Sequence, residues 1–329
     1  MKIGIRTRHG EEEALTVAEQ IGADGASLWA SAFEGFRRNY LPGIDEFAAM
    51  RERFEKHHLM WTGMGVVCEG FMKNQLLGLP GRDEEIDKLC EIIRRLGEVY
   101  QDVPASETPV IIMDQRPTYW AHEGWTGGKR IPGRGGVLLY DFDNDRDAEH
   151  RDAPAGHVEL DEVWERIFYL YKRIVPVAEE ADVRLATHPD DPPLRVYRGA
   201  AQALNGIAGF KTLFDLFPNP YNGMLLCLGC MAEAGEDPIE AIRTFGGMGR
   251  IFYVHFRNVK GTVPHYTEVF PNMGDTDMVA AIKALWDVGY DRFLVPDHHF
   301  GILGETTVGA ISRAWQVGYI TALIQATRP

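Results

Sequence analysis

The sequence predicts one (β/α)8 barrel of the TIM type, and three observations favour this fold. Short apolar runs alternate with longer amphipathic stretches along the chain, as expected where buried parallel strands are each followed by a helix. Eight such units follow one another, which is the number that closes this barrel. The first apolar run is not followed by a GxGxxG motif, so an open doubly wound sheet is the less favoured alternative.

Each expected strand is a short apolar run, and each expected helix is a longer stretch with apolar residues on one face. The expected strands are Lys2–Arg6, Gly25–Trp29, Leu59–Val67, Pro109–Asp114, Val183–His188, Met224–Cys227, Ile251–Phe256 and Arg292–Asp297. The expected helices are Glu11–Ile21, Ile44–His57, Asp83–Gln101, Leu160–Ala181, Tyr197–Leu204, Phe210–Phe217, Pro238–Phe245, Asp275–Val288 and Thr306–Ala326.

One long segment, Gln115–Glu159, lacks this regular alternation. Loops of such length inside a compact domain are typically lids or binding loops. Trp120 and Trp125 stand among glycines here, and a disordered linker would contain few aromatic residues. We therefore expect a single domain over residues 1–329 with an inserted lid over 115–159, in which Trp120 and Trp125 either shield the site or pack the loop down. A second irregular stretch, Val259–Met273, follows the seventh strand.

Composition and charge exclude several classes of function. The 329 residues contain 34 Lys and Arg against 48 Asp and Glu, for a net charge of −14, which opposes binding to nucleic acid or to an anionic membrane surface. The longest apolar runs are far shorter than the roughly 20 residues of a membrane span. Four cysteines are too few for a disulfide scaffold. We expect a cytoplasmic protein that acts on a small molecule.

Four consecutive expected strands, the fifth to the eighth, end in residues that can bind a metal ion. These residues are His188, Cys227, His255 and Asp297. The active site of this barrel lies at the carboxyl ends of its strands, and neighbouring strands are about 4.8 Å apart. One divalent ion can therefore be reached by all four. Imidazole, thiolate and carboxylate ligands are natural for zinc or iron and are compatible with manganese.

Cys227 belongs to a CxxC sequence, so the choice between its two cysteines needs an argument. Cys227 closes an apolar run, whereas Cys230 lies beyond a glycine in the following loop, and we therefore expect Cys227 to be the ligand. A structural zinc site would need a second cysteine pair. The other two cysteines, Cys68 and Cys90, are too far apart in sequence to supply it.

Several polar residues near the expected strand ends are further candidates. Arg257 stands two residues after His255, on the same face of the strand, where it could clamp a substrate carboxylate or pair with a neighbouring aspartate. Asp190 and Asp191 could orient His188 or cap the next helix.

The end of the first strand offers further polar groups. Arg6, Arg8 and His9 follow one another closely there. They are expected either as contacts for a small anionic substrate or as an ordinary surface turn.

Five motifs between the fifth and eighth strands together resemble the mannonate dehydratases of the hexuronate pathway. They are His188-Pro-Asp-Asp-Pro-Pro193, Cys227-Leu-Gly, Val254-His-Phe-Arg-Asn258, Glu268-Val-Phe-Pro-Asn-Met-Gly-Asp-Thr-Asp-Met278 and Asp297-His298. The block from Glu268 to Met278 is the most specific of them. The part before residue 110 contributes little beyond the barrel opening, and Gly133-Arg-Gly-Gly136 adds weaker support.

The resemblance implies dehydration of D-mannonate, or a closely related hexonate, to 2-keto-3-deoxy-D-gluconate. It implies a divalent metal, typically Mn2+ with Fe2+, Co2+, Ni2+ or Zn2+ as alternatives, bound by the four residues at the strand ends. It makes His298 the candidate acid or base. A homodimer is expected by the same analogy.

The chain departs from the family pattern after the eighth strand, where a Gly-Tyr-Gly stretch is usual but Gly301–Gly309 contains no tyrosine. The second proton-transfer group is therefore left open between Asp190, Tyr266 and an ordered water, and Tyr266 is also a candidate substrate contact. The alternative functions are a metal-dependent sugar isomerase or epimerase of the xylose-isomerase-like barrels, and a catalytically altered homologue that binds sugar acids.

Overall fold

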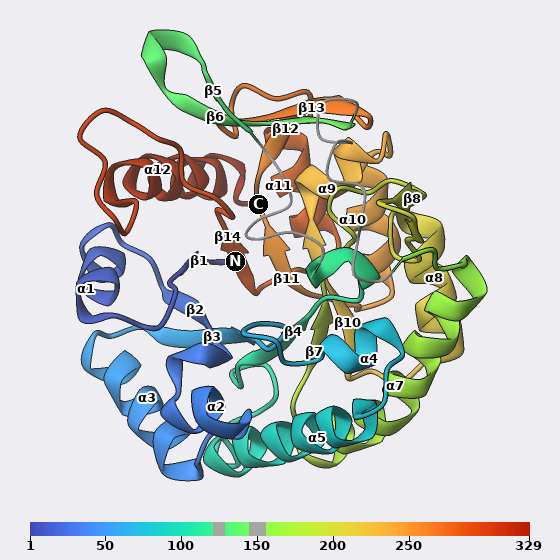
Figure 1. Ribbon diagram of the computed structural model, residues 1–329. Helices are drawn as coiled ribbons and strands as arrows, with labels where there is room; N and C mark the ends of the chain where they lie inside the picture. Colours follow the sequence, from blue (N-terminus) through green and yellow to red (C-terminus); the bar gives the residue numbers. More distant parts are fainter. Residues whose placement is uncertain (121–128, 145–155) are drawn as a thin grey trace.

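A computed structural model of the chain describes residues 1–120, 129–144 and 156–329. Eight parallel strands form a closed barrel in the order β1-β14-β11-β10-β7-β4-β3-β2, with helices around it (Figure 1). The barrel strands are β1 (Lys2–Arg6), β2 (Gly25–Trp29), β3 (Met60–Gly65), β4 (Val110–Met113), β7 (Leu185–Thr187), β10 (Asn222–Cys227), β11 (Ile251–His255) and β14 (Phe293–Val295). The predicted (β/α)8 fold is confirmed.

One main helix follows each barrel strand, and shorter helices stand before some of them. The main helices are α1 (Glu12–Gln20), α3 (Ile44–Lys56), α5 (Arg82–Val99), α7 (Leu160–Glu180), α8 (Ile207–Leu216), α10 (Pro238–Gly247), α11 (Met278–Asp287) and α12 (Ala310–Thr327). The shorter helices are α2 (Glu34–Asn39), α4 (Lys73–Leu77), α9 (Leu228–Glu233) and the 3-10 turns η1 (Ala30–Ala32), η2 (Pro117–Trp120) and η3 (Arg134–Gly136).

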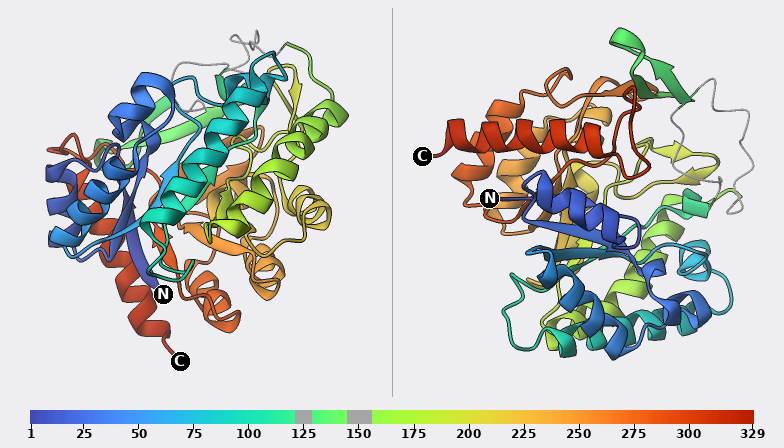
Figure 2. Two further views of the ribbon diagram at one scale, coloured as in Figure 1. Left: turned by 90° about the horizontal axis from the view of Figure 1, so that it is seen from below. Right: turned by 90° about the vertical axis from the view of Figure 1, so that its left-hand side faces the viewer.

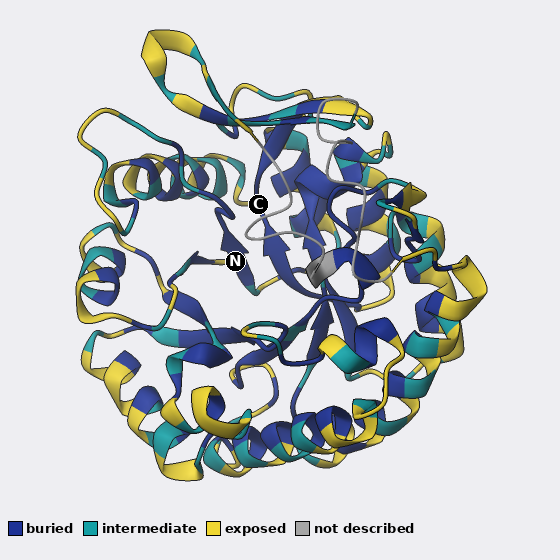
Figure 3. Cartoon of the chain, viewed as in Figure 1, coloured by how far each residue is buried: buried dark blue, intermediate teal, exposed yellow. Residues whose placement is uncertain are grey.

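The burial of the elements explains why the sequence folds this way. Every residue of β10 and β11 is buried, because these strands are covered by side chains on both faces. In α7 the buried residues recur three or four positions apart, as Val163, Ile167, Leu170 and Ile174 do, so one face of the helix packs on the barrel. Figure 3 shows the same division, with buried strands inside and exposed residues on the outer helix surfaces.

The segments expected to be irregular contain an additional antiparallel sheet. Its strands, in the order β12-β13-β6-β5, are Asn258–Thr262, His265–Val269, Leu138–Asp143 and Lys129–Pro132. The expectation of irregular structure over Gln115–Glu159 and Val259–Met273 is therefore wrong for these parts. The inserted segment and the loop after β11 are joined by backbone pairing of β13 with β6.

The helix expected at Tyr197–Leu204 is also wrong. The structure has a hairpin there, β8 (Val196–Tyr197) paired with β9 (Ala200–Ala201). The two residues between these strands, Arg198 and Gly199, both have positive φ angles, 49° and 85°. A two-residue turn with positive φ at both positions is the usual connection of a tight hairpin and cannot belong to an α-helix.

The two ends of the barrel differ. Figure 2 shows both chain termini at one end and the β5–β6 hairpin at the other, the end to which the barrel strands point. The described helices include none that combines the length and the apolar character needed to cross a membrane.

Candidate active site

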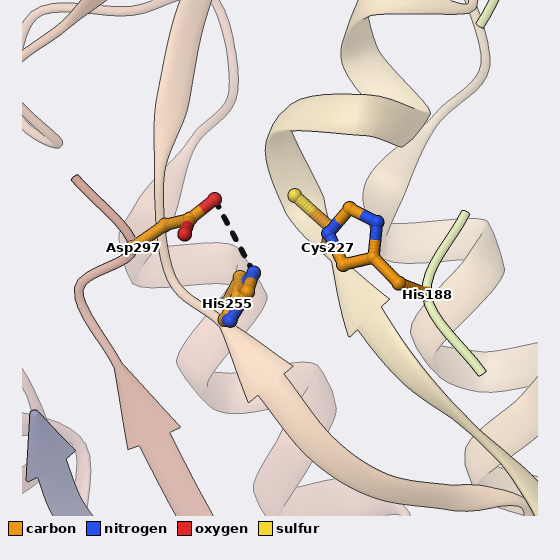
Figure 4. Close-up of side chains that lie close together, drawn as sticks. All are labelled: His188, Cys227, His255 and Asp297. Carbon is orange, nitrogen blue, oxygen red and sulfur yellow. Dashed lines mark ion pairs between the residues drawn. The ribbon is translucent and has the colours of Figure 1, made fainter. Parts of the chain in front are cut away.

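The four residues predicted at the strand ends lie together at one rim of the barrel. The strands that carry them, β7, β10, β11 and β14, are consecutive in the barrel. Cys227 and His255 are direct partners in the pairing of β10 with β11. One ligand atom from each of His188, Cys227, His255 and Asp297 lies within 4.8 Å of the others. Figure 4 shows the four side chains directed toward a common space.

The electrostatics of these four residues favour the ionised forms of Cys227 and Asp297. Burial raises the pKa of the Cys227 thiol, but a hydrogen bond from Cys230 and the charge of Arg257 outweigh this, so that the pKa is well below its usual value. Burial also raises the pKa of Asp297, but the charges of His255 and His298 bring it well below the normal range. Both residues are therefore ionised, as metal ligands must be.

The imidazole of His188 is also oriented to bind a metal. The Nδ1 atom of His188 lies 2.6 Å from the carbonyl oxygen of Pro189, so this nitrogen carries the proton and Nε2 is left with a lone pair. His255 lies next to Asp297, with 3.3 Å between Nδ1 and Oδ2 (Figure 4).

The residues present fit a divalent cation. Within the described residues, His255 Nδ1 and Asp297 Oδ1 are buried polar atoms that lie in ion pairs but make no hydrogen bond of normal geometry, and a bound cation would satisfy them. The donor set of two imidazoles, one thiolate and one carboxylate is a normal set for a divalent transition metal. The group can therefore hold a metal ion, and the identity of the metal stays a prediction.

Arg257 lies at the centre of a buried polar network next to this group. Its side chain is 2% exposed. The guanidinium donates to sulfur and carboxylate atoms of five residues: Cys227 Sγ (3.2 Å), Cys230 Sγ (3.1 Å), Asp191 Oδ2 (2.9 Å), Glu233 Oε1 (2.6 Å) and Glu268 Oε2 (3.2 Å). A guanidinium has five N–H donors, so each of them is accounted for by these contacts.

The position of Arg257 contradicts the expectation that it clamps a substrate carboxylate. A buried guanidinium whose donors are all engaged has none to offer a ligand. The alternative prediction, an ion pair with an aspartate, holds for Asp191. Asp191, Cys230 and Glu233 also form a compact group of metal-ligand types, but the cation inside that group is Arg257.

The candidate acid or base, His298, is buried beside the four proposed metal ligands, which we call the ligand group. Its Nδ1 lies 2.7 Å from Glu268 Oε2, and its Nε2 lies 3.6 Å from Asp297 Oδ1. The ring of Tyr140 lies 5.1 Å from the His298 ring, centroid to centroid. His298 therefore faces the ligand group with Nε2.

The other candidates divide between the rim and the interior. Arg6 is partly exposed and its Nη1 lies 3.1 Å from Asp297 Oδ1, so it borders the ligand group. Arg8 is exposed, and His9 contacts Ser31 Oγ at 3.1 Å.

Two candidates for proton transfer are engaged in supporting contacts. Asp190 is 2% exposed, and its Oδ2 accepts from the Leu204 amide at 2.7 Å, while burial and the nearby Asp114 charge raise its pKa to about 7. Tyr266 is buried and donates to Asp191 Oδ1 at 3.1 Å. The Trp120 side chain and all of Trp125 lie outside the described residues.

The sequence reasoning missed Glu268 and Glu233, both of which contact Arg257. Glu268 belongs to the most specific motif, and it stands two residues after Tyr266. In a strand this spacing puts both side chains on one face, and that face of β13 is turned toward Arg257. The strand pattern of His265–Val269 was the signal that could have identified it. No comparable signal marks Glu233.

Fold and site together define a TIM-barrel protein with a candidate metal centre at the carboxyl end of its strands. A model of the family described as D-mannonate dehydratase (UxuA) matches residues 147–328. Mannonate dehydratase of Thermotoga neapolitana is 33% identical over 278 residues, 76% of this chain and 77% of that protein. Mannonate dehydratase of Thermotoga petrophila is 32% identical over 311 residues, 86% of each. The chain belongs to the mannonate dehydratase family.

Solved structures agree on the fold. The crystal structure of mannonate dehydratase from Streptococcus suis serotype 2 superposes with a TM-score of 0.82 at 24% identity, covering 99% of this chain and 93% of that one. D-psicose 3-epimerase from Clostridium cellulolyticum H10 superposes with a TM-score of 0.62 at 15% identity, covering 100% and 98%. The second likeness shows that the barrel is shared with sugar epimerases.

Proposed function

We propose that this protein removes water from D-mannonate, or a closely related hexonate, and releases 2-keto-3-deoxy-D-gluconate. The observation that carries the proposal is the convergence of His188, Cys227, His255 and Asp297 within 4.8 Å in a chain of the mannonate dehydratase family. We propose that these four residues hold one divalent ion, with Mn2+ as the first candidate.

The chemistry explains why such a site is needed. The C2 proton of a hexonate is only weakly acidic, because the neighbouring group is a carboxylate, and its removal creates a second negative charge. A divalent ion bound here would supply a Lewis acid for that charge. A base must take the C2 proton, and an acid must protonate the C3 hydroxyl as it leaves.

The residues of the chain can be assigned parts in this reaction. His298 presents Nε2 to the ligand group, and we assign it one of the two proton transfers. Arg6, partly exposed beside Asp297, replaces Arg257 as the proposed contact for the substrate carboxylate. Asp190 and Tyr266 are held in other hydrogen bonds, so an ordered water is the favoured second proton-transfer group.

The family membership disfavours the isomerase or epimerase alternative, because the similarity to the epimerase structure extends to the fold alone. All four cysteines are unpaired, and thiols are kept reduced in the cytosol, which supports the proposed cytoplasmic location. The proposed homodimer stays a prediction.

The test is a hexonate panel with the metal-reconstituted protein. D-Mannonate with Mn2+ should give a 2-keto-3-deoxy acid, detected by a colour reaction for that product, while epimeric hexonates with the opposite configuration at C2 should react more slowly. An absence of product from every hexonate, with the metal shown to be bound, would refute the dehydratase proposal and favour a binding protein.

A further inference from the structure

Glu268 is a buried carboxylate at a rigid position. It lies on β13, whose backbone pairs with Val259 of β12 on one side and with Tyr140 of β6 on the other. The residue is 1% exposed. A side chain that starts from the middle of a sheet and is fully buried has little freedom, so its contacts are set by the fold.

The carboxylate of Glu268 joins Arg257 to His298. Its Oε2 accepts from Arg257 Nη1 at 3.2 Å and lies 2.7 Å from His298 Nδ1. A guanidinium can only donate hydrogen bonds, so Oε2 acts as an acceptor toward Arg257, and the same oxygen is the acceptor offered to His298. The hydrogen of this short contact must therefore be on His298 Nδ1.

A proton on Nδ1 determines the chemistry of the other nitrogen. In a neutral imidazole with hydrogen on Nδ1, Nε2 carries a lone pair and can accept a proton. Nε2 is the nitrogen that faces Asp297 Oδ1, at 3.6 Å. With the opposite tautomer, a neutral His298 would present an N–H to the ligand group and could not act there as a base.

The backbone of His298 is held as well. Gln316 of α12 donates from Nε2 to the His298 carbonyl oxygen at 3.0 Å and to Ser312 Oγ at 3.1 Å. The backbone of the residue is thus held by α12, while Glu268 contacts the ring at Nδ1.

We propose that Glu268 is a positioning residue for the reaction, which holds His298 in the tautomer with hydrogen on Nδ1 and directs Nε2 at the metal-ligand group. Arg257 supports it by donating to the same oxygen, Oε2 of Glu268. This assignment rests on the proposed dehydratase function for its kinetic consequence, but the tautomer itself is independent of the substrate. Glu268 is too deeply buried to touch a hexonate, so its effect reaches the reaction through His298.

The rival explanation is that Glu268 serves only as a counter-ion for Arg257, and Asp191 provides the matched control. Asp191 is also buried, and its Oδ2 accepts from Arg257 at 2.9 Å, but its other carboxylate contact is the Tyr266 hydroxyl, not His298. Glu268→Gln and Asp191→Asn each remove one charge from the same arginine. Only the first replaces the carboxylate next to His298 Nδ1 by an amide, which can present either an oxygen or an NH2 group and so no longer fixes the tautomer.

The experiment compares these two variants with the wild-type protein, all loaded with Mn2+ for kinetics. Glu268→Gln should lower kcat for D-mannonate about 100-fold or more, the usual contribution of a general acid or base, with KM within about twofold and full metal content. Asp191→Asn should keep kcat within about tenfold of wild type. Equal losses in the two variants, or a Glu268→Gln enzyme with wild-type kcat, would overturn the assignment.

A second measurement needs neither a substrate nor a folded variant of Glu268. The tautomer of His298 is read from long-range 1H–15N correlation spectra of the zinc-loaded wild-type protein at alkaline pH, where imidazoles are neutral, and the signal is assigned by its loss in His298→Gln. Hydrogen on Nδ1 is the expected result, and hydrogen on Nε2 would overturn the proposal. If wild type fails to dehydrate any hexonate, the proposed function fails while this spectrum still decides the role of Glu268.

Discussion

The Nε atom of Arg257 donates to the Sγ atom of Cys227 at 3.2 Å, so the buried cation contacts the thiolate proposed as a metal ligand. The same guanidinium lies 3.3 Å from Asp297 Oδ2. One arginine therefore contacts two of the four proposed ligands, Cys227 and Asp297. Substitutions that displace this arginine should lower the affinity for the metal.

Removal of the thiolate should remove the metal. Cys227→Ala is expected to reduce the bound metal from about one ion per chain to a small fraction, because a three-donor site binds a divalent ion far more weakly. Metal content is measured by elemental analysis after dialysis. Cys90→Ala, on the outer helix α5, is the control and should retain the ion. Full retention in the Cys227 variant would exclude Cys227 as a ligand.

Gly229 should be intolerant of any side chain. A Cβ atom at this position would lie 2.7 Å from Arg257 Cγ, 2.8 Å from its Nε and 2.9 Å from its Cζ, so Gly229→Ala must displace the guanidinium from Cys227. We expect a loss of metal affinity of about 10–100-fold, typical for damage to the residues that orient ligands.

The matched control for this variant is Gly247→Ala. A Cβ there would have no neighbour within 4 Å, and alanine in place of a helical glycine stabilises by up to about 1 kcal/mol. Isothermal titration with Mn2+ gives both affinities. Equal affinities in the two variants would show that Arg257 does not support the ligands.

Arg257→Met should destabilise the fold strongly. The substitution leaves Asp191, Glu233 and Glu268 without their shared cation, and a buried charge that has lost its partner typically costs about 3–5 kcal/mol in the free energy of unfolding. Urea denaturation measures the change. Arg173→Met removes ion pairs to exposed Asp83 and Asp87 and should cost about 1 kcal/mol or less. Similar values for both variants would argue against the buried network.

Metal affinity should increase with pH up to about 9. In the metal-free protein, burial lowers the pKa of His255, but the charge of Asp297 and hydrogen bonds to Asp297 and Cys227 outweigh this and raise it to about 9. Because a metal binds neutral imidazole, binding below that pH must release a proton, and affinity rises by up to about tenfold per pH unit. Calorimetry in two buffers of different ionisation enthalpy counts the protons, and zero release at pH 7 would contradict the prediction.

Arg6 and Arg8 should differ in their effect on the substrate. Arg6→Gln is expected to raise KM for D-mannonate about tenfold or more, since hydrogen bonds to charged groups contribute about 1.5–3 kcal/mol. Arg8→Gln, at an exposed position, should leave KM nearly unchanged. Steady-state kinetics at constant metal content distinguish them, and equal effects would remove Arg6 from the proposed carboxylate contact.

The barrel and the approach of the four strand-end residues could be predicted from the sequence, because both follow from short apolar runs and their order along the chain. An apolar run such as Met224–Cys227 identifies a buried strand, and the barrel topology then brings its last residue to the rim. The hairpin at Arg198 and Gly199 was missed because a short, mixed segment gives no clear periodicity.

The network around Arg257 could not be predicted in the same way. Its partners come from the β7 loop, α9 and β13, which are distant in sequence, and no periodicity relates Asp191 to Glu233 or Glu268. Only three-dimensional packing brings three carboxylates to one guanidinium. For the same reason the sequence leaves two roles open for Arg257, a clamp for a substrate carboxylate and an ion pair with an aspartate, and only the packing decides for the ion pair.

The pairing of β6 with β13 changes how the inserted segment should be regarded in protein engineering. Its turn at Gly135 and Gly136 is open, with space around both positions, but both residues have positive φ angles, 66° and 81°. Residues can therefore be added beside the turn at little cost, whereas exchange of either glycine would strain the backbone. The base of the hairpin is different, because Tyr140 is paired in register with Glu268. A shortened β6 would shift the strand that carries Glu268. The inserted segment therefore cannot be deleted without moving a residue that contacts His298.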